Sequence, residues 1–410
     1  MQIKPILSAL RHHKAGTVLV ALQIALTLAI VCNALFIIQQ RVSHLSRPSG
    51  IDEAHLIRIQ NQWVGQGDND YASLIATDLA TLRKVPGVVN AYATNSVPLS
   101  NGGWSMGVNL EPEKPDQSKS AAQTALYFVD HNTVETLGLK LVAGRNFRAS
   151  EVGNFMPRSK SQPPVVMVTR DLAHKLYPTG SAVGKVLYTI DKPSTIIGVV
   201  ERMQVPWVGN WAASWGGNSL LVPARLITNG SNYVVRVQPG QLNTVLHSAP
   251  GALYASNRMR MIPDDGGVMP FSEIRAEAYA KDHGMAILMS VICFVLLGIT
   301  AAGIVGLTSF WVGQRRKQIG VRRALGATRN DILGYFLTEN LMIAMAGVAL
   351  GAILALAMNQ WLMQAFEMQR MPWVWIVSGV IVLLLLGQAA VMAPALRASR
   401  VPPALATRTV

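Results

Sequence analysis

The chain has 410 residues, of which half are hydrophobic and only 14% are charged. An ordinary soluble protein carries about 25% charged residues, so this composition indicates segments that span a membrane. The net charge of +14 would suit a nucleic-acid-binding protein, but most of the Lys and Arg residues lie beside apolar runs. We therefore interpret the charge as a topology signal that attracts anionic lipid.

The N-terminal residues predict a helix on the membrane surface followed by a membrane span. Residues 1–14 are basic, and their apolar residues recur at helical spacing, which predicts a cytoplasmic amphipathic helix. Residues 15–40 contain no charge and exceed the ~20 apolar residues that cross a hydrocarbon layer, so they form the first predicted span. Cys32 in this span and Cys293 in the second are each expected to be a small buried hydrophobic residue.

Residues 41–283 predict an α+β domain with a stalk helix at its end. Short runs rich in β-branched residues predict strands, and helical periodicity with capping residues predicts the helices between them. The predicted strands are Leu56–Ile59, Val88–Thr94, Val165–Thr169, Thr195–Val200 and Tyr233–Val237, and the predicted helices are Ala72–Lys84 and Asp171–Leu176. Residues 111–120 and 207–217 predict loops.

The second of these loops carries Trp207, Trp211 and Trp215, a tryptophan at every fourth position. One interpretation is a surface for a periplasmic partner or substrate, because exposed apolar patches mark contact sites. The other is that the three rings pack onto their own domain. The sequence leaves both interpretations open.

The end of the domain predicts a charged surface helix. Its charged residues stand at helical spacings and are Glu273, Arg275, Glu277 and Lys281. Glycine is the only helix breaker between this segment and the second predicted span, residues 284–313. We therefore expect one continuous helix that forms a rigid stalk.

Residues 314–331 are the most basic segment of the chain and lie between the second and third spans. Their basic residues are Arg315, Arg316, Lys317, Arg322, Arg323 and Arg329. Lys and Arg beside a span mark the cytoplasmic side. The small and apolar residues of this segment suit a short helix that docks a cytoplasmic ATPase. The alternative is an ordinary loop whose only role is to set topology.

The rest of the chain predicts two more spans. The segments are a third span at 332–363, a short periplasmic turn at 364–370, a fourth span at 371–394 and a cytoplasmic tail at 395–410. Gly347 and Gly351 form a GxxxG pattern, which predicts close packing of the third span against another helix. The predicted fold class is an α-helical membrane protein with four transmembrane helices and an α+β extracytoplasmic domain between the first two.

The sequence carries no pattern that indicates catalysis or metal binding. Gly180–Lys185 resembles a phosphate-binding loop, but its spacing is one residue short and Val186 replaces the required hydroxyl. The pairs Asp130–His131 and Asp171–His174 are interpreted as exposed turn or helix-surface residues. We therefore expect a non-catalytic subunit with no cofactor or metal of its own, whose energy comes from another polypeptide.

Three stretches resemble a known family of membrane proteins. Gln318–Ala327 is similar to the pattern E-I-G-I-R-x-A-L-G-A of MacB/FtsX-type ABC transporter permeases, with Gln318 in place of the usual Glu. Pro394–Leu405 is similar to the C-terminal pattern of that family. Leu137–Phe147 is similar to the pattern L-G-x-x-L-x-x-G-R-x-F in its extracytoplasmic domain. The resemblance covers most of the chain, and residues 201–270 match least.

The resemblance implies a bacterial inner-membrane permease that pairs with a second permease, identical or homologous, and with two copies of a separate ABC ATPase. ATP and Mg²⁺ would bind the ATPase, whose closure would move the stalks and reshape the periplasmic domains, a mechanism called mechanotransmission. The residues implied to couple to the ATPase are Gln318, Gly320, Arg322, Arg323, Gly326 and Ala327. In some members a periplasmic adaptor and an outer-membrane tunnel protein complete an efflux path.

Three functions stay open on the sequence alone. The first is export of amphipathic substrates such as peptides or antibiotics. The second is that of an FtsX-like regulator of periplasmic enzymes, which transports nothing, or of a permease that extracts lipoproteins. The third is that of a membrane-anchored periplasmic enzyme or receptor without an ATPase. The sequence does not identify the substrate.

Overall fold

The computed structural model describes residues 14–65, 70–112, 120–157, 163–189, 192–366 and 369–400. The chain divides into two compact units, which we call the helical unit (Met1–Ser46 with Lys281–Val410) and the α+β unit (Arg47–Ala280). The predicted amphipathic helix at 1–14 lies outside the described residues except for Lys14. Most of the predicted loop at 111–120 and the end of the tail at 395–410 also lie outside them.

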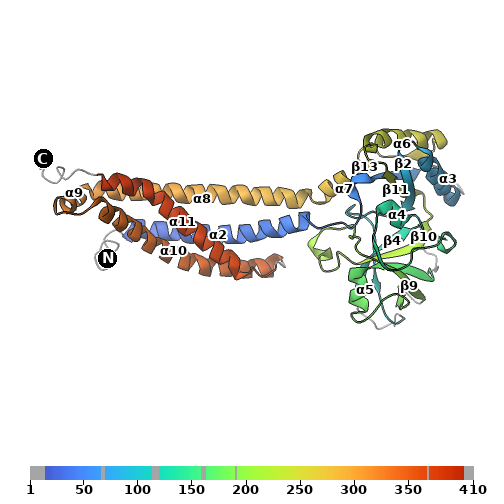
Figure 1. Ribbon diagram of the computed structural model, residues 1–410, viewed down its shortest axis with the longest axis horizontal. Helices are drawn as coiled ribbons and strands as arrows, with labels where there is room; N and C mark the ends of the chain where they lie inside the picture. Colours follow the sequence, from blue (N-terminus) through green and yellow to red (C-terminus); the bar gives the residue numbers. More distant parts are fainter. Residues whose placement is uncertain are drawn as a thin grey trace. The chain divides into compact units, whose positions relative to one another are not determined.

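The helical unit contains long apolar helices that follow the predicted spans. They are α2 (Lys14–Leu45), α8 (Ala280–Gln314), α10 (Arg329–Phe366) and α11 (Trp373–Ser399), and the short helix α9 (Arg316–Ala324) joins α8 to α10. These four long helices have the length and composition to cross a membrane. With the α+β unit inserted between the first and second of them, the predicted fold class is confirmed (Figure 1).

Each long helix extends beyond the apolar run that predicted it. The clearest difference is at the C-terminus, where α11 continues through Pro394 to Ser399 and does not end near Pro394. Pro394, Ala395 and Ala398 are all buried against the other helices. The stabilisation from packing this last turn therefore exceeds the cost of the backbone hydrogen bond that is missing because proline has no N–H group.

The glycines of the predicted GxxxG pattern lie where α10 meets α2. A Cβ atom at Gly347 would lie 2.9 Å from the carbonyl oxygen of Ala21, and one at Gly351 would lie 2.8 Å from that of Ala25. Both distances are shorter than a Cβ atom tolerates, so only glycine allows the two backbones to come this close. α2 is the most enclosed of the four, with 56% of its most apolar window buried against 17% for α8.

The α+β unit contains a five-stranded antiparallel sheet covered on one face by two helices. Its strands are β1 (Leu56–Trp63), β2 (Val88–Thr94), β11 (Gly230–Val237), β12 (Arg260–Met261) and β13 (Val268–Pro270), in the order β12-β1-β11-β2 with β13 also paired to β1. Alternate residues such as Ile57 and Ile59 form one apolar core with residues of α3 (Tyr71–Lys84) and α6 (Leu242–Ser256). Both helices lie beside this sheet in Figure 1.

A second, mixed sheet forms the rest of this unit. Its strands are β3 (Trp104–Val108), β4 (Ala122–Val129), β10 (Ser219–Leu226), β7 (Val165–Thr169), β9 (Pro193–Val200) and β5 (Leu141–Gly144) in that order, with β6 (Gly153–Phe155) on β10 and β8 (Val186–Tyr188) on β9. β10 pairs parallel with β4, and β7 pairs parallel with β9. The short helices α4 (Thr133–Leu137) and α5 (Arg170–Leu176) follow β4 and β7.

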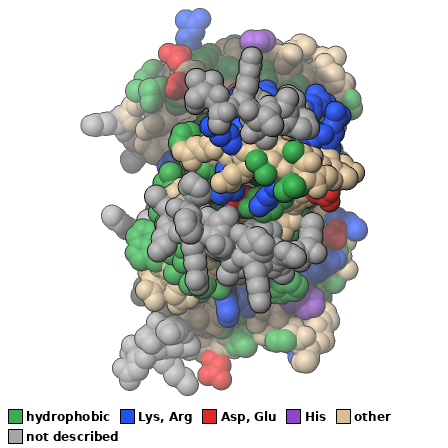
Figure 2. Space-filling view, turned by 90° about the vertical axis from the view of Figure 1, so that its left-hand side faces the viewer, with side chains coloured by type: hydrophobic (Ala, Val, Ile, Leu, Met, Phe, Trp, Pro, Cys, Tyr) green, Lys and Arg blue, Asp and Glu red, His purple; other side chains and the backbone are tan. Residues whose placement is uncertain are grey.

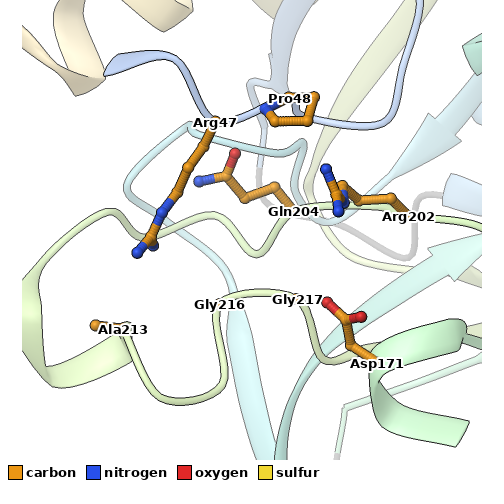
Figure 3. A pocket seen from close by; sticks show the side chains of 8 residues that line it. All are labelled: Arg47, Pro48, Asp171, Arg202, Gln204, Ala213, Gly216 and Gly217. Carbon is orange, nitrogen blue, oxygen red and sulfur yellow. The ribbon is translucent and has the colours of Figure 1, made fainter. Parts of the chain in front are cut away.

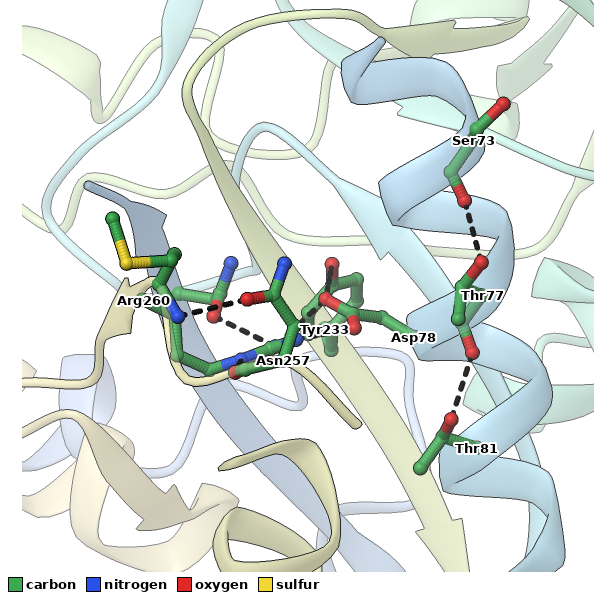
Figure 4. Close-up of polar contacts among 9 residues, drawn as sticks. Ser73, Thr77, Asp78, Thr81, Tyr233, Asn257 and Arg260 are labelled. Atoms are coloured by element: carbon green, nitrogen blue, oxygen red, sulfur yellow. Dashed lines mark hydrogen bonds and ion pairs between the residues drawn. The ribbon is translucent and has the colours of Figure 1, made fainter. Parts of the chain in front are cut away.

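A buried ion pair joins α3 to the edge of the five-stranded sheet (Figure 4). The Arg260 guanidinium donates to both carboxylate oxygens of Asp78 at 2.7 and 2.8 Å, and the Tyr233 hydroxyl donates to the same carboxylate at 2.6 Å. The Arg260 and Asp78 side chains are 0% and 1% exposed. Three charge-assisted hydrogen bonds offset the loss of water around this carboxylate.

The predicted continuous stalk helix is interrupted by one residue. α7 (Phe271–Ala278) contains Glu273, Arg275 and Glu277, whereas Lys281 belongs to α8, and Tyr279 lies between the two helices in a non-helical turn. The Tyr279 side chain is 3% exposed and its hydroxyl accepts a 2.9 Å hydrogen bond from Nε2 of Gln204. Because this residue is anchored inside the α+β unit, the prediction of an unbroken stalk is wrong at this point.

Candidate functional site

The basic segment between α8 and α10 is held in place by an enclosed ion pair. Arg315 caps the N-terminus of α9, and its guanidinium lies 3.0 Å from both carboxylate oxygens of Glu339 on α10. The two side chains are 11% and 4% exposed. Removing either partner would leave a charge with little water around it, so this pair fixes the turn from α8 into α9.

The two arginines predicted to couple to an ATPase also have partners within the chain. Nη1 of Arg323 donates to the backbone carbonyl of Ser399 at 2.8 Å, which ties α9 to the end of α11. The guanidinium of Arg322 lies 5.0 Å from the centre of the Tyr335 ring on α10, a cation–π contact. Together these contacts orient α9 against two of the long helices.

α9 is consequently a two-sided helix. Its inner side carries Ile319 and Gly320, which are both buried. Its outer side carries Gln318 and Val321, and the C-cap residue Leu325 continues this side; the three lie three and then four positions apart, a spacing that places them on one helical face. We call these three residues the α9 stripe.

Two members of the α9 stripe are apolar and unusually exposed. Val321 is 47% exposed and Leu325 is 83% exposed, and they lie among the exposed basic side chains of Arg316, Lys317 and Arg322. In the view onto the α9 end, hydrophobic side chains lie next to Lys and Arg side chains (Figure 2). The sequence shows that both residues are apolar, but only the three-dimensional structure shows that their side chains are exposed and not packed against the long helices.

Gly326 has a conformational role that the sequence did not reveal. Its φ of +101° belongs to the left-handed region, and no described atom lies within 4 Å of the position of a Cβ. The N–H groups of Gly326 and Ala327 donate to the carbonyls of Arg323 and Arg322 and so close the C-terminus of α9. The left-handed backbone at this position thus gives a reason for glycine that does not depend on a partner.

The three tryptophans of residues 207–217 form one cluster. The ring centroids of Trp207, Trp211 and Trp215 lie 5.3 to 5.7 Å from one another, and Trp215 donates from Nε1 to the carbonyl of Trp211 at 3.2 Å. Trp215 is 6% exposed whereas Trp211 is 60% exposed. Trp215 thus serves internal packing, and Trp211 is the ring left available for a contact surface.

The stretch 137–147 owes its pattern to local structure. Gly144 has a φ of +76°, and a Cβ there would lie 2.1 Å from the carbonyl oxygen of Ile197 on the neighbouring strand β9. Arg145 forms two hydrogen bonds with Glu151, at 2.6 and 2.8 Å, and these bonds lower the pKa of the Glu151 carboxyl to about 2. These residues therefore have structural roles within the α+β unit: Gly144 allows the close approach to β9, and Arg145 holds Glu151.

The pairs that were considered for catalysis have ordinary structural positions. Asp130 is buried, not exposed as expected, and it accepts hydrogen bonds from the Asn132 N–H and the Thr133 hydroxyl at the start of α4. Asp171 is exposed in the first turn of α5. Within the described residues, no group of three or more His, Cys, Asp or Glu side chains could hold a metal ion.

Two protein-family models match the chain. Residues 17–249 match the MacB-like periplasmic core domain, and residues 290–403 match the C-terminal domain of FtsX-like permeases. The first match covers more than half of the chain and includes most of α2 and most of the α+β unit. The second begins within α8 and includes the α9 stripe.

Individual relatives agree with these models. The macrolide export ATP-binding/permease protein MacB of Chromobacterium violaceum is 28% identical over 220 residues, which are 53% of this chain and 32% of the relative. The protein of the same name in Neisseria gonorrhoeae is 24% identical over 295 residues, 66% of this chain and 40% of the relative. The chain therefore spans less than half the length of either relative.

The structure is also similar to the periplasmic region of MacB from Actinobacillus actinomycetemcomitans. That likeness has a TM-score of 0.34 at 18% sequence identity and covers 57% of this chain and 97% of that chain.

Proposed function

This chain belongs to the family of permeases that combine a MacB-like periplasmic core domain with an FtsX-like permease domain, and from this premise we propose that it is the permease subunit of an inner-membrane ABC transporter. ATP hydrolysis takes place on a separate ATPase in this proposal. The exported substrates are amphipathic molecules such as peptides or antibiotics.

The observation that carries the proposal is the α9 stripe. An exposed Leu side chain contributes about 1.5–3 kcal/mol when a partner buries it, and Leu325 is more exposed than any other large hydrophobic side chain among the described residues. The surrounding Arg and Lys side chains suit a partner with acidic residues at the rim of the contact. A cytoplasmic ATPase with an apolar groove and an acidic rim fits this surface.

The contacts behind the stripe suit the transmission of movement. Arg315 joins α9 to Glu339 on α10, and Arg323 joins it to the end of α11. α10 in turn packs closely against α2 at Gly347 and Gly351. A push on α9 would therefore act on these helices together, as mechanotransmission requires. The complex contains two permeases and two ATPase subunits in this proposal, and a periplasmic adaptor and an outer-membrane tunnel complete the route.

Co-purification from the native host tests the docking role. The tagged full-length chain should recover a polypeptide that contains a phosphate-binding loop and hydrolyses ATP. Leu325→Asp replaces the apolar contact with a charge and should lower recovery of that ATPase about tenfold or more. Met156→Asp is the matched control, because Met156 is 60% exposed in the α+β unit and should leave recovery unchanged. Full recovery with Leu325→Asp, or no ATPase with the unchanged chain, would refute the docking role.

A second measurement tests export. A strain that lacks the chain should become more sensitive to amphipathic antibiotics or peptides, and the unchanged chain and the Met156→Asp variant should both restore resistance. The Leu325→Asp variant should not. Unaltered sensitivity of the deletion strain to a broad panel of such compounds would argue for the non-transporting role instead.

A further inference from the structure

A small pocket in the α+β unit collects charged side chains from distant parts of the sequence (Figure 3). Its volume is about 260 Å³. Its walls are the segment that follows α2, the turn after β9, the first turn of α5 and the loop that carries the tryptophan cluster. The lining residues are Arg47, Pro48, Asp171, Arg202, Gln204, Ala213, Gly216 and Gly217.

Three charged side chains border this pocket without pairing to one another. Arg47 and Arg202 lie on either side of Gln204 in the close-up, and Asp171 lies beside Gly217 (Figure 3). Within the part of the chain that the structure describes, none of these three forms an ion pair. Elsewhere in this unit exposed arginines do pair, as Arg145 does with Glu151. The pocket therefore offers two cations and one anion to a ligand.

The loop on one side leaves room for the carboxylate. A Cβ atom at Gly217 would lie 1.9 Å from Oδ2 of Asp171, so a side chain at this position would displace the Asp171 carboxylate. The loop itself is braced, because Trp215 is buried in the tryptophan cluster and the carbonyl of Gly216 accepts from the N–H of Val205 at 3.1 Å. The pocket wall is thus built around the Asp171 carboxylate.

The fourth polar group is a buried amide with an unused acceptor. Gln204 is 6% exposed, and its backbone is fixed by hydrogen bonds from its N–H to Ser49 and to its carbonyl from Tyr127. Its Nε2 donates to the Tyr279 hydroxyl, but its Oε1 has no partner among the described residues. A buried acceptor without a hydrogen bond costs about 1–3 kcal/mol, and a donor on a ligand would remove that cost.

We propose that this pocket binds a small zwitterion in which an ammonium group lies next to a carboxylate or a phosphate. Arg47 and Arg202 bind the oxyanion, because guanidinium groups donate hydrogen bonds to carboxylates and phosphates. The Asp171 carboxylate and Oε1 of Gln204 accept from the ammonium group. The volume is below the ~300 Å³ at which pockets for drug-sized ligands begin, so the ligand is an amino acid or a headgroup of similar size.

Free α-amino acids and O-phosphoethanolamine are the probes that distinguish the two sources of this chemistry. Calorimetric titration of the full-length chain in detergent should show saturable one-to-one binding of at least one of them. An amino acid that binds alone identifies a carboxylate ligand, and O-phosphoethanolamine that binds alone identifies a lipid-type headgroup. N-acetylation of the ligand amine should weaken binding about tenfold or more, because it removes the ammonium charge.

Two variants separate ligand chemistry from structural damage. Arg202→Gln should weaken every zwitterion about tenfold, whereas Asp171→Asn should weaken the zwitterion and strengthen the N-acetylated anion. Arg258→Gln and Asp265→Asn, at exposed positions of the same unit outside the pocket, should change neither affinity. The proposal fails if no zwitterion binds, if acetylation has no effect, or if the control variants weaken binding as much. None of these outcomes depends on an ATPase or on transport.

Discussion

At the scale of single residues, the Asp78–Arg260 pair holds parts of the chain together that lie 182 positions apart. The Tyr233 hydroxyl donates to the same carboxylate, and the side-chain oxygen of Asn61 accepts from Nη1 of Arg260 at 3.1 Å, so both charges are hydrogen-bonded beside an apolar core. Such a pair adds little to the free energy of unfolding compared with apolar residues of the same shape. The loss of one partner, however, leaves an unpaired charge buried in the protein. The pair therefore specifies the position of α3 on its sheet.

This reasoning predicts an asymmetry between single and double variants. Asp78→Leu and Arg260→Met should each lower the free energy of unfolding by about 3–5 kcal/mol, because each leaves the other charge buried and unpaired. The double variant should lose less than either single one. Urea unfolding of the full-length chain, followed by tryptophan fluorescence, measures all three. Additive losses in the double variant would contradict this account.

The same scale explains why some site residues were predicted and others were not. The sequence singled out the basic residues of α9 because Lys and Arg beside an apolar run mark the cytoplasmic side of a membrane. The exposure of Val321 and Leu325 was not predicted, because it depends on which side of α9 packs against α10 and α11. The role of Gly326 in ending α9 was missed for a related reason, because the identity of a residue as glycine does not show whether its φ is positive.

At the scale of elements, the close packing of α10 against α2 depends on glycine. Gly351→Leu would place its side chain within the space held by the Ala25 backbone and Leu28, so it should force the two helices apart. We expect a clear fall in melting temperature and in the yield of monodisperse protein from detergent. Gly298→Leu on α8 is the matched control, because a Cβ there meets no described atom within 4 Å. Equal behaviour of the two variants would show that the close approach does not stabilise the bundle.

Elements were predicted unevenly. The strands at Val88–Thr94 and Val165–Thr169 were predicted with the bounds that the structure shows, because both are compact runs of apolar and β-branched residues. The strand β10 was missed, because Pro223 interrupts its pattern even though it pairs with three other strands. The break at Tyr279 was missed as well, and nothing in the sequence indicates that this side chain is buried and hydrogen-bonded to a residue 75 positions away.

At the scale of the whole molecule, the arrangement of spans predicts which segments face which compartment. Glu111→Cys, in the α+β unit, should react with a membrane-impermeant maleimide in spheroplasts. Arg329→Cys, at the start of α10, should react only after the membrane is disrupted. The native cysteines should contribute little background, because Cys32 and Cys293 are 0% and 5% exposed. The reverse labelling pattern would overturn the topology.

The enclosure of α2 has a consequence for the order of synthesis. This helix is made before α8, α10 and α11, which carry the partners of its buried polar groups. Thr27 pairs with Thr300 at 2.7 Å, and Asn33 donates to the carbonyl of Ala355, 322 positions further along the chain. While the ribosome makes the α+β unit, α2 has to wait in the lipid with its amide and hydroxyl groups unpaired by these later helices. Assembly of the bundle is therefore a late event with long-range contacts, and a nascent chain truncated before α10 should expose α2 to membrane proteases and insertion factors.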